Sequence, residues 1–116
     1  MKLAEMSEQE ILCFVNPIMD NLMLGSTEID YEKHVRDFTK HLKALISEAG
    51  LKRMCSEYQA HWGVFQKREF VALFRRHDSI AVIWRQFCSK TNDEYVASAV
   101  FVETNGRVLV DHALIY

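Results

Sequence analysis

Asp111 and His112 are the neighbouring residues of this chain best suited to proton transfer. A histidine titrates near neutral pH, and a buried carboxylate with a raised pKa can also move protons. The surrounding residues alternate as in a β-strand, where neighbours point to opposite faces, so the two cannot form a dyad. His112 shares its expected face with Val108, Val110 and Leu114, which makes it the best candidate for a proton carrier in a cavity. A hydrogen-bonded core or interface histidine is the commoner role, and for Asp111 a polar contact at an edge or interface is expected.

Two aromatic residues, Tyr31 and Trp84, are candidates for lining a ligand cavity. Such cavities are mostly apolar and aromatic, with few polar groups. Both residues fit an ordinary core equally well. Arg85 lies between apolar residues and could pair with a carboxylate in an interface or receive an anionic ligand. Because bare anion sites usually combine several donors, interface pairing is favoured.

The sequence predicts neither a metal ion nor a cofactor. His34 and His41 are seven residues apart on a predicted helix with Asp37 between them, whereas metal sites need i, i+4 spacing or ligands from two elements. A solvated helix face is therefore expected. The three cysteines show no CxxC pairing and are expected to pack as free thiols. Glycine-rich phosphate loops, GxSxG elbows and HExxH motifs are absent.

Composition indicates one soluble domain over residues 1–116, with ordinary proportions of apolar and charged residues. The net charge of −2 argues against nucleic-acid binding, which favours a clearly basic domain. No apolar run approaches the roughly 20 residues that a membrane span needs. The acidic N-terminus does not look like a secretory signal, and with unpaired cysteines this predicts a cytoplasmic protein.

Helices are expected over about residues 7–62. Ser7 is followed three residues later by a glutamate, which forms a capping box at the start of a helix with one apolar stripe. Gly25 is predicted to end that helix. Asp30 and Ser47 are the expected caps of two further amphipathic helices.

Strands joined by tight turns are expected from residue 64 onward. Asn105-Gly106 is the strongest hairpin signal, since both turn positions favour positive φ. The short connections predict an antiparallel meander, and apolar residues occupy both faces of it. Helices can cover one face, so a partner subunit or a ligand must cover the other, and a homodimer through the sheet is predicted. The predicted strands span about 64–76, 80–88, 95–103 and 107–116.

Three helices followed by a four-stranded antiparallel meander resemble the nuclear-transport-factor-2-like (cystatin-like) superfamily. The stretch Ile29-Asp30-Tyr31-Glu32-Lys33, a later helix ending Trp62-Gly63 and the Asn-Gly-Arg-Val turn are similar to an uncharacterised bacterial branch of it. The resemblance covers about residues 8–116. It implies an α+β fold in which N-terminal helices pack on a curved four-stranded antiparallel sheet, shaped as a cone with a cavity at its wide end.

The resemblance also implies a homodimer through the sheets and a pocket between helices and sheet. The superfamily includes isomerases, dehydratases, polyketide cyclases and non-catalytic modules, and its enzymes use a cavity Asp or His as proton shuttle. We expect a non-catalytic domain that binds a small apolar ligand at Tyr31, Trp84 and His112, or a homodimeric assembly domain. An isomerase or dehydratase with His112 as proton shuttle is the alternative, and a structural dimer with a filled core is a third possibility.

Overall fold

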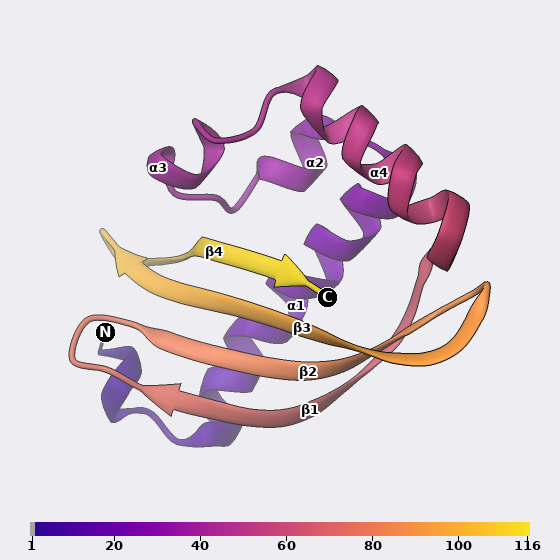
Figure 1. The fold of residues 1–116 in the computed structure, drawn as a ribbon. Coiled ribbons are helices and arrows are strands. Elements are labelled where there is room, and N and C mark those ends of the chain that lie inside the picture. The colour runs from indigo at the N-terminus through magenta and orange to yellow at the C-terminus, as the bar shows by residue number, and fades with distance from the viewer. Residues whose placement is uncertain (1) are drawn as a thin grey trace.

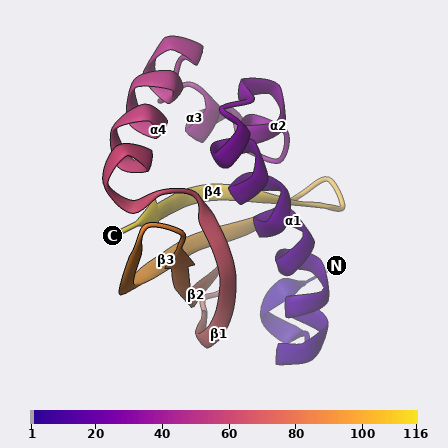
Figure 2. The ribbon, with the colours of Figure 1, turned by 90° about the vertical axis from the view of Figure 1, so that its right-hand side faces the viewer.

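The computed structural model describes residues 2–116, so Met1, the predicted start of the domain, lies outside the described residues. Its strands form one antiparallel sheet in the order β1-β2-β3-β4, and α1 lies across one face of it (Figures 1 and 2). The α+β meander predicted from the sequence is confirmed. The elements are η1 (Leu3–Glu5), α1 (Glu8–Glu28), α2 (Tyr31–Val35), α3 (Lys40–Lys43), α4 (Glu48–Trp62), β1 (Phe65–Arg75), β2 (Ile80–Cys88), β3 (Thr91–Thr104) and β4 (Arg107–Ile115).

Helix α1 begins as predicted but ends later than predicted. Ser7 and Glu10 form the reciprocal capping box, with hydrogen bonds of 3.0 and 3.1 Å. The predicted end at Gly25 is wrong, because α1 continues to Glu28 and stops at Ile29, whose φ is +53°. Gly25 is buried where α2 crosses α1, and a Cβ there would lie 2.7 Å from the backbone nitrogen of His34. The glycine therefore permits close packing of two helices.

The predicted second helix is divided into α2 and α3. Asp30 caps α2 and Ser47 caps α4, as predicted. The helix does not continue beyond α2, because residues 37–39 pair with the edge of β4. The Val110 N–H donates to the Asp37 carbonyl at 2.7 Å, and the Thr39 N–H donates to the Val110 carbonyl at 2.9 Å. This pairing covers part of an edge that would otherwise expose unpaired backbone groups.

The hairpin at Asn105-Gly106 is confirmed, with φ values of +53° and +79°. Strand β3 begins at Thr91, four residues before the predicted start at residue 95. Opposite the middle of β3, strand β4 contains a bulge: Val100 pairs with His112, whereas the next residue, Phe101, pairs with Val110.

The bulge places the extra residue, Asp111, between these two pairs and reverses the alternation beyond it. Val110 is fully buried against α1, but His112 is exposed, and Ala113 and Ile115 are the residues that pack inward. The prediction that His112 shares a face with Val110 is therefore wrong. The Asp111 carboxylate accepts a 2.8 Å hydrogen bond from the Thr39 hydroxyl, which confirms a polar contact at the sheet edge.

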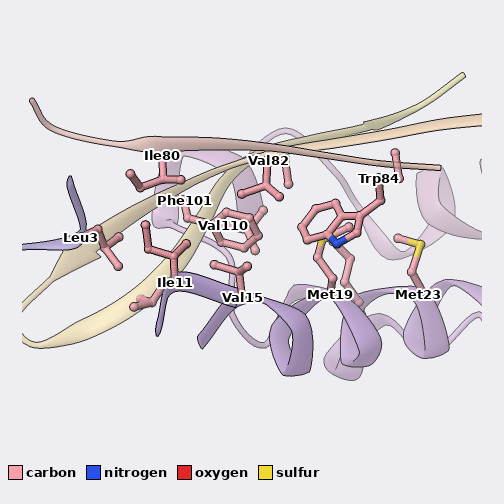
Figure 3. Close-up of a cluster of buried hydrophobic side chains, with 14 residues drawn as sticks. Leu3, Ile11, Val15, Met19, Met23, Ile80, Val82, Trp84, Phe101 and Val110 are labelled. Carbon is pink, nitrogen blue, oxygen red and sulfur yellow. The ribbon is translucent and has the colours of Figure 1, made fainter. Parts of the chain in front are cut away.

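The core lies between α1 and the inner face of the sheet (Figure 3). Trp84 is its largest buried side chain, 1% exposed, with its ring edge-on to Phe101 at 6.3 Å. Its indole N–H donates to the Asn16 side-chain oxygen at 3.2 Å, so the polar atom is satisfied. The residues from α1 that meet the sheet are Ile11, Val15, Met19, Leu22 and Met23.

The opposite face of the sheet is also apolar, as predicted. Its central side chains are partly exposed and point away from α1; they are Ala81, Ile83, Val100, Val102 and Leu109, which we call the outer patch. At one end of this face Arg85 forms ion pairs with Glu69 at 3.3 Å and Glu94 at 2.7 Å. The partners of Arg85 thus lie in its own chain, and the interface pairing favoured from the sequence is not needed to satisfy it.

An ion-pair cluster fastens the connection between α2 and α3 to the start of β4. The Asp37 side chain, 11% exposed, accepts hydrogen bonds from Arg36 at 2.8 Å and Arg107 at 2.7 Å. Burial alone would raise the pKa of Asp37, but the two arginines outweigh it and lower the pKa below its ordinary value.

Replacing this carboxylate tests the cluster. Because the folded-state pKa of Asp37 is lowered, its stabilisation is present above the unfolded-state pKa of about 3.9 and is lost as the pH falls through the folded-state value. Asp37→Asn should reduce the unfolding free energy by about 1–2 kcal/mol at pH 7, with the difference shrinking below about pH 4. Urea denaturation at both pH values measures this. Exposed Asp93→Asn is the control, and an equal loss in both variants would contradict the cluster's role.

Candidate ligand-binding site

A cavity of about 370 Å³ is lined by residues of α1, α2, α3, α4 and the end of β4. The helices α2, α3 and α4 lie together above β4 in Figure 1. Its wall contains no Lys, Arg, Asp or Glu among the residues that the structure describes. Leu45, Met54 and Leu114 stand at its rim and are themselves 46–70% exposed. Its other apolar wall residues are Leu22, Met23, Phe38, Leu42, Ile46, Trp62, Phe65, Ala113 and Ile115.

Besides the indole N–H of Trp62, the wall contains three polar side chains, two of which already satisfy each other. The hydroxyls of Ser26 and Tyr58 are 2.7 Å apart, and the Cys55 thiol is 3.4 Å from the Ser26 hydroxyl. Burial raises the pKa of both the Tyr58 hydroxyl and the Cys55 thiol, so both groups stay protonated at neutral pH. The Gln59 amide donates to the Ser26 and Thr27 carbonyls at 3.2 Å, so this network joins α1 to α4.

His34 is the third polar side chain of the wall, and its Nδ1 atom is buried without a hydrogen-bond partner. The residue is 8% exposed, and its ring meets the edge of the Phe38 ring at 5.2 Å. Burial lowers the pKa of His34 to about 4, so the imidazole is neutral at pH 7. A neutral imidazole can donate one hydrogen bond and accept another, but it supplies no positive charge.

Sequence reasoning placed His34 on a solvated helix face together with His41, and this is wrong. Helix α2 ends at Val35, so His41 belongs to the separate helix α3. The sequence contains little signal for this position, because the i, i+4 spacing of His34 and Phe38 indicates a shared face only in a continuous helix, and Phe38 lies outside α2. Among residues 2–116, no three His, Cys, Asp or Glu side chains gather closely enough to hold a metal ion.

The three residues predicted to bind the ligand are not brought together. Trp84 is in the core beside Asn16, and His112 is exposed on the far side of the sheet; neither belongs to the cavity wall. Tyr31 lies beside a separate surface hollow, where its hydroxyl donates to the Ile46 carbonyl at 3.2 Å. That contact holds the loop before α4 in place. Tyr31 therefore supports Ile46, a residue of the cavity wall, without lining the cavity itself.

Cys13, Cys55 and Cys88 are free thiols. Cys55 and Cys88 are buried, as predicted, whereas the predicted packing of Cys13 is wrong, because it is exposed on α1. No helix in the described part of the chain is long and apolar enough to span a membrane.

Neither the protein-family models nor the curated proteins contain a match to the chain. Solved structures do match it. A putative calcium/calmodulin-dependent protein kinase type II association domain from Thiobacillus denitrificans has 12% identity and a TM-score of 0.61, over 86% of this chain and 91% of that one. A SEC-C motif-containing protein from Rhodopseudomonas palustris has 11% identity and a TM-score of 0.56, over 89% of each chain.

A third match bears directly on the resemblance seen in the sequence. It is a nuclear-transport-factor-2-like protein of unknown function from Pseudomonas putida, with 12% identity and a TM-score of 0.54 over 87% of this chain and 82% of that one. Identities this low establish the fold and nothing about activity. The chain therefore has the nuclear-transport-factor-2-like fold.

Proposed function

We propose that this protein is a non-catalytic domain that binds a small, uncharged, mostly apolar molecule in the cavity between its helices and β4. The observation that carries the proposal is the wall itself: about 370 Å³ lined mostly by apolar side chains, without a formal charge among the described residues. This volume lies within the range of small-molecule sites, roughly 300–1,000 Å³. An ionised ligand would lose its hydration there without gaining an opposite charge, so neutral ligands are favoured.

The protonation states in the wall support binding over catalysis. A proton shuttle works best with a pKa near the operating pH. The pKa of His34 is lowered to about 4, whereas that of Tyr58 is raised, so the two move away from neutrality in opposite directions. His112, the proton carrier of the isomerase or dehydratase alternative, lies outside the wall. These observations favour the non-catalytic reading.

Filling the cavity should weaken the binding of an apolar probe. We expect N-phenyl-1-naphthylamine, an uncharged fluorophore, to bind saturably with one site per chain. Ala113→Phe places an aromatic ring in the wall and should weaken binding at least about ten-fold by occupying the site. Ala60→Phe makes the same change at an exposed position of α4 and should leave affinity unchanged. Fluorescence titration measures both, and equal affinities in the two variants would refute a site in this cavity.

We also propose that a second copy of the chain covers the outer patch. The outer patch lies at the centre of the outer sheet face, whose four strands, about 4.8 Å apart and about 30 Å long, present roughly 570 Å² per copy if the whole face is covered. Two copies would then bury about 1,100 Å², which is near the lower limit for a specific interface. The ion pairs of Arg85 with Glu69 and Glu94 place polar groups beside the apolar patch, the arrangement of a polar rim.

Light scattering tests the assembly. At micromolar concentration the protein should have twice the chain mass of 13.6 kDa. Val100→Lys puts a charge in the middle of the outer patch and should give the monomer mass, because an unpaired ammonium resists burial. Leu24→Lys, at an exposed position of α1, should remain dimeric. A wild-type protein of single-chain mass would rule out this dimer.

A further inference from the structure

We propose that the ligand carries a hydroxyl group on its apolar body, an alcohol or a phenol, and that His34 forms the hydrogen bond that orients it. This inference rests on the proposed binding function. His34 is the side chain that would select the polar group of the ligand.

The assignment follows from the partners of the three polar side chains in the wall. The Ser26 and Tyr58 hydroxyls are 2.7 Å apart and already bonded to each other, and the Tyr58 oxygen also accepts from the Gln59 amide at 3.4 Å. Neither hydroxyl has to find a partner in the ligand. His34 differs, because no protein group bonds either ring nitrogen among the described residues. Nδ1 is closed off from the cavity as well as from solvent, so Nε2 is the ring nitrogen that a ligand group can reach.

The surroundings of the imidazole select the chemistry of its partner. No carboxylate or cationic side chain belongs to the wall in the described residues, so an ionised acid or amine would be held without a counter-charge. Burial keeps the ring neutral, with one nitrogen as donor and the other as acceptor. A hydroxyl both donates and accepts, so it can pair with the imidazole in either tautomer. A carbonyl or ether oxygen can pair only with an N–H.

The rest of the wall suits a flat, apolar body. Phe38 packs edge-on to the His34 ring, and Tyr58 stacks on Phe65 with ring centres 4.8 Å apart. All four side chains line the cavity. An aromatic or alicyclic skeleton would contact these rings while its hydroxyl meets the imidazole.

Matched probes that differ by one oxygen test the inference. Dissociation constants for 2-naphthol and naphthalene are measured by NMR titration of the wild-type protein, His34→Phe and His77→Phe. Wild-type protein should bind 2-naphthol about three- to ten-fold more tightly than naphthalene, which corresponds to one net hydrogen bond. His34→Phe should lose that preference and still bind naphthalene. His77→Phe, the same change at an exposed turn, should keep it.

A second readout requires no substitution and covers the case in which His34→Phe does not fold. The ring ¹⁵N shifts of His34 should change on adding 2-naphthol but not on adding naphthalene, while those of the exposed His41, His61 and His77 serve as internal references. Equal affinities for the two probes, or a preference retained in His34→Phe, would overturn the role of His34 while leaving the cavity as a binding site. If neither probe binds, the proposed function fails, and the inference fails with it.

Discussion

Gly25→Ala should reduce the unfolding free energy by about 3 kcal/mol, and the melting temperature by about 10 °C. In an ordinary helix interior, replacing glycine with alanine raises the free energy of unfolding by up to about 1 kcal/mol. At Gly25 we expect the opposite effect, a loss of stability. The reason is steric. The added Cβ would lie 2.7 Å from the backbone nitrogen and 2.8 Å from the Cα of His34, and backbone atoms cannot rotate away. Helix α2 would have to move off α1 and carry the cavity wall with it.

The control is Gly50→Ala in the first turn of α4. Its Cβ would meet only side-chain atoms, the nearest being the Ser47 hydroxyl at 3.1 Å. We expect a change within about 1 kcal/mol, since a contact of 3.1 Å is relieved by a shift of a few tenths of an ångström and the helix gains an alanine. Chemical denaturation of both variants provides the comparison. If Gly25→Ala were as stable as Gly50→Ala, the packing of α2 on α1 described above would be incorrect.

Gly63→Ala is the second substitution with a large expected effect, again about 3 kcal/mol. Gly63 joins α4 to β1 with φ of +83° and ψ of −151°, a conformation that is nearly confined to glycine. The added Cβ would overlap the Ser89 hydroxyl oxygen and lie 2.8 Å from the backbone nitrogen of Lys90. Ser89 cannot simply rotate away, because its hydroxyl accepts a 2.9 Å hydrogen bond from the Val64 N–H.

Gly106→Ala measures the cost of backbone strain without the steric overlap expected at Gly63. Gly106 also has a positive φ, +79°, but no atom lies within 4 Å of the position where its Cβ would be. We expect a loss of about 1 kcal/mol from the strained backbone alone. Thermal unfolding of both variants would show a gap of about 2 kcal/mol, and similar losses at the two positions would mean that the contact of Gly63 with Ser89 is not tight.

Features encoded by neighbouring residues were predictable from the sequence. The capping box at Ser7, the caps at Asp30 and Ser47 and the hairpin at Asn105-Gly106 depend on residues three or fewer positions apart. The apolar character of both sheet faces also follows from strand alternation, which is a local pattern. These signals, with the order of the elements, were sufficient to predict the fold.

The candidate site depends on contacts between distant residues, and it was not predictable in the same way. The bulge at Asp111, which turns His112 outward, coincides with pairing to Asp37 and Thr39, more than 70 positions earlier. Strand alternation gives no sign of it, because the local pattern continues on both sides. His34 lines the cavity because Gly25 lets α2 pack closely on α1. In the sequence alone, a single glycine in a helical pattern equally predicts the end of a helix.

A crystal structure of the protein grown with N-phenyl-1-naphthylamine would show whether the cavity is a ligand-binding site. We expect the probe to lie between α4 and the end of β4, in contact with Phe38 and Ala113 and beside the His34 ring. A probe bound instead on the outer face of the sheet, with the cavity closed by its own side chains, would contradict this expectation.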